Sequence, residues 1–224
     1  MCLLHRKLIL ALSAALATGA ASLTAAASAA AATPGLVPIE VDGAELVYFQ
    51  AKPLEDPKGG PKFQGSDFIH PLKTPSGFVV TESQPGDHPH HFGLWWPWKF
   101  AQQEGGKRAL YWELQRGQGR IETRAHERIP GGLIAESVYL DRTGSGVPTV
   151  ALNETTRIQA SSIAQVGRAN GYVLHIAINQ TVAGDAPVTV NQYRYSGFAL
   201  RGASAWNRNT SHILTSEGAD RDAA

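Results

Sequence analysis

Cysteine is almost missing from the sequence: among 224 residues only Cys2 carries a thiol. Cys2 precedes a segment typical of a secretory signal peptide, in which basic residues are followed by an apolar run over 8–23 and a small-residue cleavage site at 27–29. We therefore expect residues 1–32 to be removed on export, with a single membrane anchor as the alternative interpretation. The mature domain, residues 33–224, would then work in the periplasm or outside the cell. Without a thiol it could form no disulfide, use no thiol catalysis and bind no metal through cysteine.

An excess of charge of one sign is also lacking. The sequence has 20 Lys and Arg against 19 Asp and Glu, and no basic run. Nucleic acid binding requires positive charge that neutralises phosphates, so we expect no nucleic acid partner. After residue 32 no apolar stretch is long enough to cross a bilayer, and we expect no membrane span in the mature chain. About 190 residues remain, which is enough for one domain held together by buried apolar surface.

Helical periodicity is lacking too, whereas short runs typical of strands recur between Gly, Pro and Ser turn signals. Many short strands at near-regular spacing predict an all-β sandwich or barrel. The segment 53–65, rich in Pro, Gly and Lys, is predicted to be a surface loop. The predicted strands cover residues 45–49, 77–81, 109–114, 119–126, 132–140, 153–160, 172–181, 188–195 and 196–202.

Histidine is concentrated in one stretch, DHPHHFGLWWPW, which runs from Asp87 to Trp98. On an extended segment His88 and His90 would point to one side and His91 to the other. Clustered imidazoles can transfer protons, bind a metal together with a carboxylate, or support a loop through hydrogen bonds. The spacing matches no regular zinc motif, so the sequence identifies no metal ligand and no cofactor.

Aromatic and charged residues add candidates for a ligand pocket. Trp95 and Trp96 alternate, so one indole should be core and the other should reach a pocket and stack on a sugar ring. His70 lies just before a proline-stiffened turn. Glu217 is a candidate general base at a strand end, and Arg201 is a candidate for holding a hydroxyl or carboxylate. A hydrogen-bonded structural histidine and a solvated turn glutamate are the alternatives.

Three blocks of the sequence resemble the bacterial PmoA-like family, a domain of unknown function often labelled methane oxygenase PmoA. They are HPLKTPSG at 70–77, DHPHHFGLW at 87–95 and TSEG at 215–218, and the resemblance covers nearly the whole mature chain. It implies a large antiparallel β-sandwich (supersandwich) similar to galactose mutarotases and an association with carbohydrate degradation. Members usually continue into further strands, so the sandwich should be incomplete at the C-terminus. The position after the double histidine, often arginine in the family, is Phe92. The pocket that the resemblance implies contains His70, His88, His90, His91 and Glu217.

These observations predict an exported carbohydrate-active protein with a small-molecule sugar or glycoside as its ligand. His90 or His91 would donate a proton to a ring or glycosidic oxygen, and Glu217 would act as the base. Two alternatives stay open. In the first, His88 and His90, with Asp87 or Glu217, hold a divalent metal in a hydrolase or oxygenase. In the second, a non-catalytic module binds sugar through its aromatic side chains. The predicted substrate contacts are His70, His88, Trp95, Trp96 and Arg201.

Overall fold

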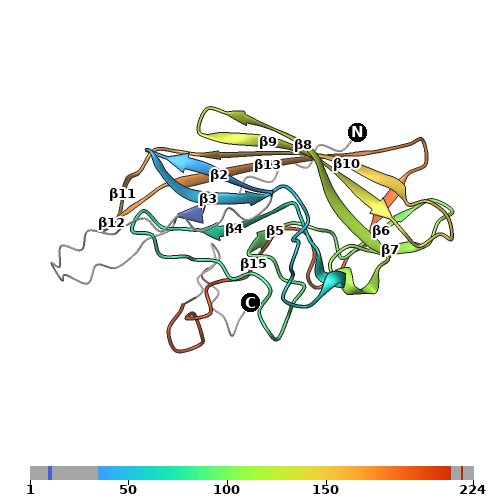
Figure 1. Cartoon of the computed structure of the whole chain (residues 1–224), viewed down its shortest axis with the longest axis horizontal. Coiled ribbons are helices and arrows are strands. Elements are labelled where there is room, and N and C mark those ends of the chain that lie inside the picture. Colours follow the sequence, from blue (N-terminus) through green and yellow to red (C-terminus); the bar gives the residue numbers. More distant parts are fainter. Residues whose placement is uncertain (1–9, 12–34, 213–217, 219–224) are drawn as a thin grey trace.

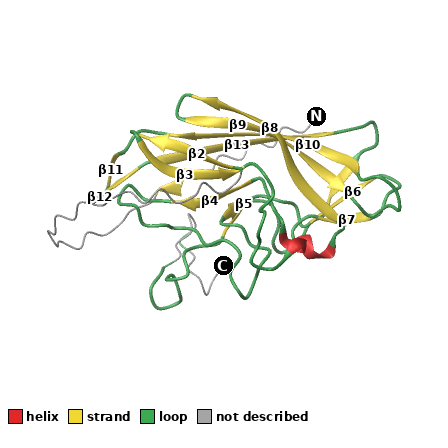
Figure 2. Cartoon of the chain, viewed as in Figure 1, coloured by secondary structure: helices red, strands yellow, loops and turns green. Residues whose placement is uncertain are grey.

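The computed structural model describes residues 10–11, 35–212 and 218, and these residues form an almost entirely β protein (Figures 1 and 2). The all-β class predicted from the alternating sequence pattern is therefore confirmed. Within this described part, the helices are too short to cross a membrane. Residues 1–32, the predicted signal peptide, lie outside the described residues except for the two-residue strand β1 (Leu10–Ala11).

The first sheet contains the long, regular strands, in the order β1-β13-β10-β9-β8. Alternate residues of β10 are buried from Leu152 to Ile158. This period of two is the mark of a strand with one buried face, and it explains why the sequence pattern reveals these strands. Their bounds are β8 (Gly119–Ile129), β9 (Gly132–Asp141), β10 (Thr149–Ala160) and β13 (Val173–Val182).

The second sheet packs against the first and completes a β-sandwich (Figure 1). Its order is β15-β5-β4-β3-β2. In the main core, apolar side chains of this sheet, such as Ile39 and Phe49, pack with Leu133 and Ile158 of the first sheet. The strands are β2 (Leu36–Val41), β3 (Ala44–Gln50), β4 (Phe68–Leu72), β5 (Leu94–Trp95) and β15 (Ala199–Leu200).

Smaller elements complete the described part. A three-stranded sheet has the order β14-β6-β7, and β11 pairs with β12 in a hairpin. Figure 2 shows a short helical segment beside β7. The bounds are β6 (Phe100–Gln103), β7 (Arg108–Leu110), β14 (Val188–Val190), β11 (Ala164–Val166), β12 (Ala169–Gly171) and the 3₁₀ helices η1 (Pro61–Phe63) and η2 (Leu114–Arg116).

Several predicted strands are shorter than expected or are not strands. Residues 77–81 make only isolated bridges, because the chain turns after Thr74 and again after Ser83. The strand predicted at 109–114 ends at Leu110 and gives way to η2. The strand predicted at 188–195 ends at Val190. The segment 53–65 is a loop containing η1, as predicted.

Two carboxyl groups, Asp67 and Glu154, lie in the interior between the sheets, each 3% exposed or less. Glu154 accepts hydrogen bonds from Trp96 Nε1 at 2.9 Å and from Gln180 Nε2 at 2.6 Å. Asp67 accepts one from Ser137 at 2.9 Å and is hydrogen-bonded to Glu154. Burial, and then the charge of Glu154, raise the pKa of Asp67 well above its usual value. Two buried carboxyls that share a hydrogen bond cannot both ionise cheaply, so we expect this pair to hold one proton.

Strand β8 is one edge of the first sheet. Its second half is exposed and carries the charged side chains Arg124, Glu127 and Arg128. Arg128 Nη1 donates a hydrogen bond of 2.8 Å to the carbonyl of Pro38 on β2. The end of this edge strand is thereby tied to the other sheet.

Candidate functional site

The three histidines lie on a closed loop between β4 and β5, residues 82–93, here called the histidine loop. At its base the Gly93 amide donates to the Glu82 carbonyl at 2.9 Å, and the Gln84 amide donates to the His91 carbonyl at 2.7 Å. The buried side chain of Gln84 donates to the carbonyls of Phe63 and Pro89, each at 3.2 Å. Gln84 therefore positions the loop, although nothing in its sequence context indicates this role.

The histidine loop is not extended. The His88 amide donates to the Pro85 carbonyl and the His91 amide to the His88 carbonyl, each at 3.0 Å, which gives two successive turns. The expectation that His88 and His90 face one way and His91 the other is therefore wrong. Pro85, Gly86 and Pro89 are residues that favour turns over strands, and they override the alternation.

The turns bring all three imidazoles together. His88 stacks on His91 with ring centroids 4.6 Å apart, and His90 meets His91 edge to face at 4.8 Å. Among the described residues, no group of three or more His, Cys, Asp or Glu side chains is arranged to hold a metal ion.

Aromatic rings continue from the histidines across the molecule. His91 lies 5.1 Å from Trp95, Trp95 lies 5.1 Å from Trp112, and Trp112 lies 5.3 Å from Tyr195, measured between ring centroids. Tyr195 in turn meets Tyr193 edge to face at 4.8 Å. Trp95 and Trp112 are buried, whereas Tyr193 is 40% exposed. The ring most open to a ligand in this series is thus a tyrosine that the sequence did not single out.

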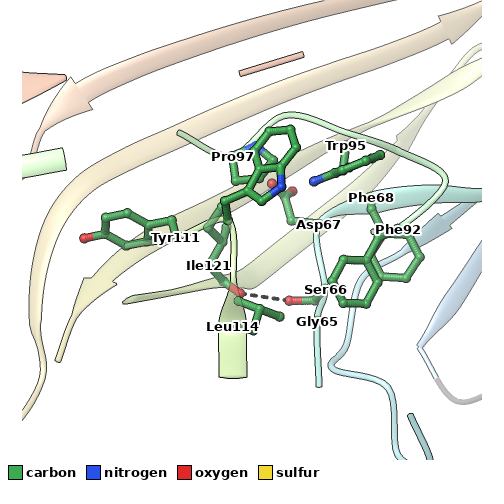
Figure 3. Close-up of a pocket in the computed structure, with 11 residues that line it drawn as sticks. Gly65, Ser66, Asp67, Phe68, Phe92, Trp95, Pro97, Tyr111, Leu114 and Ile121 are labelled. Carbon is green, nitrogen blue, oxygen red and sulfur yellow. Dashed lines mark hydrogen bonds between the residues drawn. The ribbon is translucent and has the colours of Figure 1, made fainter. Parts of the chain in front are cut away.

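The two adjacent indoles that were expected to divide between core and pocket are both buried. Trp96 belongs to the main core and donates to Glu154, so it is a core residue and not a ligand contact. Trp95 packs against the His91 ring and lines a small cavity of about 20 Å³ together with Asp67 and Tyr111 (Figure 3). A cavity of that volume holds one water molecule at most and is too small for a sugar.

A buried lysine lies at the far end of the aromatic series. Lys99 is 3% exposed, and its Nζ is 2.7 Å from Glu113 Oε2 and 3.0 Å from the Tyr195 hydroxyl. The same ammonium lies over the rings of Tyr195 and Tyr193, 4.8 and 5.1 Å from their centroids. Burial by itself lowers the pKa of Lys99, but the hydrogen bonds to Glu113 and Tyr195 outweigh it and raise that pKa. Lys99 and Glu113 therefore form a fixed ion pair.

This ion pair lines an open depression of about 560 Å³, here called the tyrosine depression. Its volume is in the range of small-molecule binding sites. The lining residues are Lys99, Phe100, Arg108, Leu110, Glu113, Arg116, Gln118, Tyr193 and Tyr195.

Electrostatics connect the histidine loop to the tyrosine depression. Burial lowers the pKa of His90, the charge of Glu113 opposes this shift, and the charges of His88 and Lys99 add to it. Burial and the neighbouring imidazoles His90 and His88 lower the pKa of His91 to about 4. His91 is thus neutral at pH 7, and the pKa of His90 is lowered too, although the charge of Glu113 opposes that shift.

Arg201, a predicted substrate contact, is engaged within the protein. Its Nη2 donates to Asp87 at 2.9 and 3.3 Å, and its Nε lies 3.5 Å from Glu82. Asp87 also accepts from His88 Nδ1 at 2.9 Å. Hydrogen bonds from His88 and Arg201 lower the pKa of Asp87. Arg201 therefore holds the histidine loop rather than offering its guanidinium to a ligand.

His70 lies on β4 and lines a different depression, of about 340 Å³, with Lys58, Thr81 and Glu82. Its Nδ1 is 2.9 Å from the Thr81 hydroxyl, and that same hydroxyl accepts a hydrogen bond from the Leu72 amide. The Thr81 proton is therefore available to His70, which fits a neutral imidazole. Burial, and then the charge of Lys58, lower the pKa of His70 to about 4.

His70 should make the protein sensitive to acid. The pKa of His70 is about 4 in the folded protein, against 6.5 for an unperturbed histidine. Between these two pH values the unfolded chain binds more protons than the folded one, so the free energy of unfolding falls as pH drops from 6.5 to 4. We expect His70→Gln to remove roughly 2 kcal/mol of that loss, a value discounted for partial exposure. Urea unfolding at several pH values measures it. The exposed His126 on β8 provides the control, His126→Gln; equal pH profiles for the two variants would contradict the assignment.

Glu217, the predicted base, lies outside the described residues. Among the described residues, the Asp87 carboxylate lies 2.9 Å from His88 Nδ1, and the charge of Glu113 acts on His90. Sequence reasoning missed Glu113, and it also missed Lys99 and Tyr195. The one available signal was a lysine between two aromatic residues, Trp98 and Phe100, in an otherwise apolar stretch.

A model of a family of unknown function (DUF6807) matches residues 36–224, and therefore covers the histidine loop and the tyrosine depression. No curated protein and no solved structure matches the chain.

Proposed function

Because the chain belongs to this family of unknown function, we propose its activity from the site itself: it is an exported carbohydrate-active protein that binds a sugar in the tyrosine depression and acts on it by acid/base chemistry. The observation that carries the proposal is that the tyrosine depression places the Glu113 carboxylate, held 2.7 Å from Lys99, in one lining with the exposed ring of Tyr193. A proton acceptor thus lies beside an open aromatic ring, and the histidine loop, connected to Tyr195 through the ring contacts of His91, Trp95 and Trp112, would supply the proton donor.

The chemistry assigns a role to each group. His90 would give a proton to the ring or glycosidic oxygen of the sugar; burial lowers the pKa of His90, which makes its protonated form a stronger acid, and the charge of Glu113 opposes part of that shift. Glu113, held 2.7 Å from Lys99, would accept the proton of a hydroxyl at the anomeric carbon. In a reducing sugar these two transfers break the bond between C1 and the ring oxygen and form the carbonyl at C1, with no change in oxidation state. Tyr193 would stack on the sugar face.

Two further considerations support a sugar as ligand. The sequence blocks around His70 and His88 resemble the PmoA-like proteins, whose expected fold is similar to galactose mutarotases. Proteins of that type would act on the anomeric carbon of a free sugar, which matches the acid and base assigned here. The β-sandwich is compatible with this, although fold by itself does not determine activity.

The proposal predicts a large effect of single substitutions on turnover. We expect His90→Gln and Glu113→Gln each to slow anomer interconversion of the sugar by about 100-fold, the usual contribution of a positioned acid or base. Exchange-resolved NMR on a panel of reducing sugars measures this. With His90 as donor, the rate should also fall as pH rises above the pKa of His90.

His126→Gln, on the exposed half of β8, is the matched control and should leave the rate unchanged. Sugar binding without turnover in the native protein would favour the non-catalytic module. Stoichiometric divalent metal that disappears in the His88→Ala/His90→Ala double variant, together with metal-dependent turnover, would favour the metal enzyme. Either result would overturn the acid/base proposal.

A further inference from the structure

The tyrosine depression carries more positive than negative charge. Its lining includes three cations, Lys99, Arg108 and Arg116, and one carboxylate, Glu113. Glu113 is paired with Lys99 at 2.7 Å. Within the described ranges, neither arginine lies within ion-pair distance of a carboxylate. Two guanidinium groups in the lining are thus left for an external anion.

The two arginines are attached to fixed backbone. Arg108 begins β7, and its guanidinium lies over the ring of Phe100 on β6, 4.2 Å from the centroid. Stacking on a ring face fixes the plane of the Arg108 guanidinium. The N–H groups along the edge of that plane stay free to bind a ligand. Arg116 ends η2, where its amide donates to the Glu113 carbonyl at 3.0 Å. The arginine of η2 is therefore tied to the same short segment as the proposed base.

The remaining lining suits a sugar ring. Tyr193 is 40% exposed and stands edge to face on Tyr195, which braces it. Gln118 adds an exposed amide at the rim. The volume of about 560 Å³ admits a mono- or disaccharide. The depression thus combines a ring for stacking, groups for hydroxyls and two cations for an acidic substituent.

We infer that the ligand of the tyrosine depression is an acidic sugar of the uronate class, whose carboxylate is bound by Arg108 and Arg116. The inference rests on the proposed function for placing a sugar here. A carboxylate is favoured because the planar guanidinium fork matches its two oxygens. Glu113 and Lys99 neutralise each other, so the net positive charge that the uronate meets comes from the two arginines.

Titration calorimetry with the full chain tests this inference. Glucuronate and galacturonate are compared with glucose and galactose, and glucose 6-phosphate serves as a different anion. We expect the uronates to bind at least about 10-fold more tightly than the neutral sugars, as charge-assisted hydrogen bonds allow. The Arg108→Gln/Arg116→Gln double variant should lose this preference and keep the neutral-sugar affinity. Arg124→Gln on β8 is the matched control and should keep it.

Each result separates this inference from the proposed function. Neutral sugars that bind and turn over with no preference for uronates would overturn the inference and leave the acid/base proposal standing. Uronates that bind through the two arginines without turnover would support the inference and overturn the proposal. Tighter binding of glucose 6-phosphate than of either uronate would show a phosphate site and overturn the assignment to carboxylate.

Discussion

Replacing Glu154 with alanine is expected to lower the free energy of unfolding by about 3–5 kcal/mol. The side chain of Glu154 accepts hydrogen bonds from Trp96, Gln180 and Thr156 in the interior. Its removal leaves these donors without their acceptor and opens a cavity between the sheets. Urea unfolding followed by tryptophan fluorescence measures the change. Glu136→Ala is the control, because Glu136 lies on the neighbouring strand β9 and is exposed; it should shift stability by less than about 0.5 kcal/mol.

A related prediction concerns Asp67, the carboxyl that is hydrogen-bonded to Glu154, and here the substitution is expected to stabilise the protein. Because burial raises the pKa of Asp67 above its usual value, the folded protein binds the extra proton and its stability falls as pH rises toward that raised pKa. Asp67→Asn supplies a permanent donor to Glu154 and should remove this loss. The variant should therefore gain stability relative to the native protein as pH rises. A native stability that does not depend on Asp67 between acid and alkaline pH would contradict the shared proton.

The second large effect is expected at Gly93, where the histidine loop rejoins β5. Gly93 has φ of +63°, and an added Cβ would lie 2.4 Å from the Ile69 carbonyl oxygen and 2.9 Å from His70 Cβ. Neither neighbour can move easily, because both belong to strand β4. We expect Gly93→Ala to cost about 3 kcal/mol of stability. It should also displace the imidazoles and slow sugar turnover, since the Gly93 amide closes the loop on Glu82.

The same loop contains its own control for this substitution. Gly86 has no positive φ, and nothing lies within 4 Å of an added Cβ. Gly86→Ala should leave the unfolding midpoint in urea unchanged and the turnover intact. Equal losses in the two variants would mean that the loop is sensitive to any methyl group, and not to the contact between Gly93 and β4.

The regular sheet could be predicted from the sequence, and the site only in part. Residues 132–140 and 153–160 follow an alternating pattern because β9 and β10 bury one face and expose the other. Near the site the pattern misleads: residues 109–114 are buried on both sides of the chain, and the strand gives way to η2 after Leu110. Glu154, in phase with Leu152 and Ile158, was an available signal for a buried acid.

The candidate site divides in the same way. The histidine cluster is visible because its members are adjacent in sequence. The pair Lys99 and Glu113 is not visible, because the hairpin of β6 and β7 separates the two residues. Arg201 shows a further limit: residue type suggested a ligand contact, whereas Asp87 and Glu82 already occupy its guanidinium. Only the three-dimensional arrangement distinguishes a binding group from one that holds a loop.

The charged edge of β8 has a consequence for how the protein behaves at high concentration. An edge strand offers unpaired amides and carbonyls on which another chain can add a strand. Arg124, Glu127 and Arg128 stand along this edge, and a second copy docking there in register would have to desolvate them. Arg128 is in addition bound to Pro38, which covers the last part of the edge. We therefore expect this edge of the first sheet to resist the addition of strands from further copies, even at high concentration.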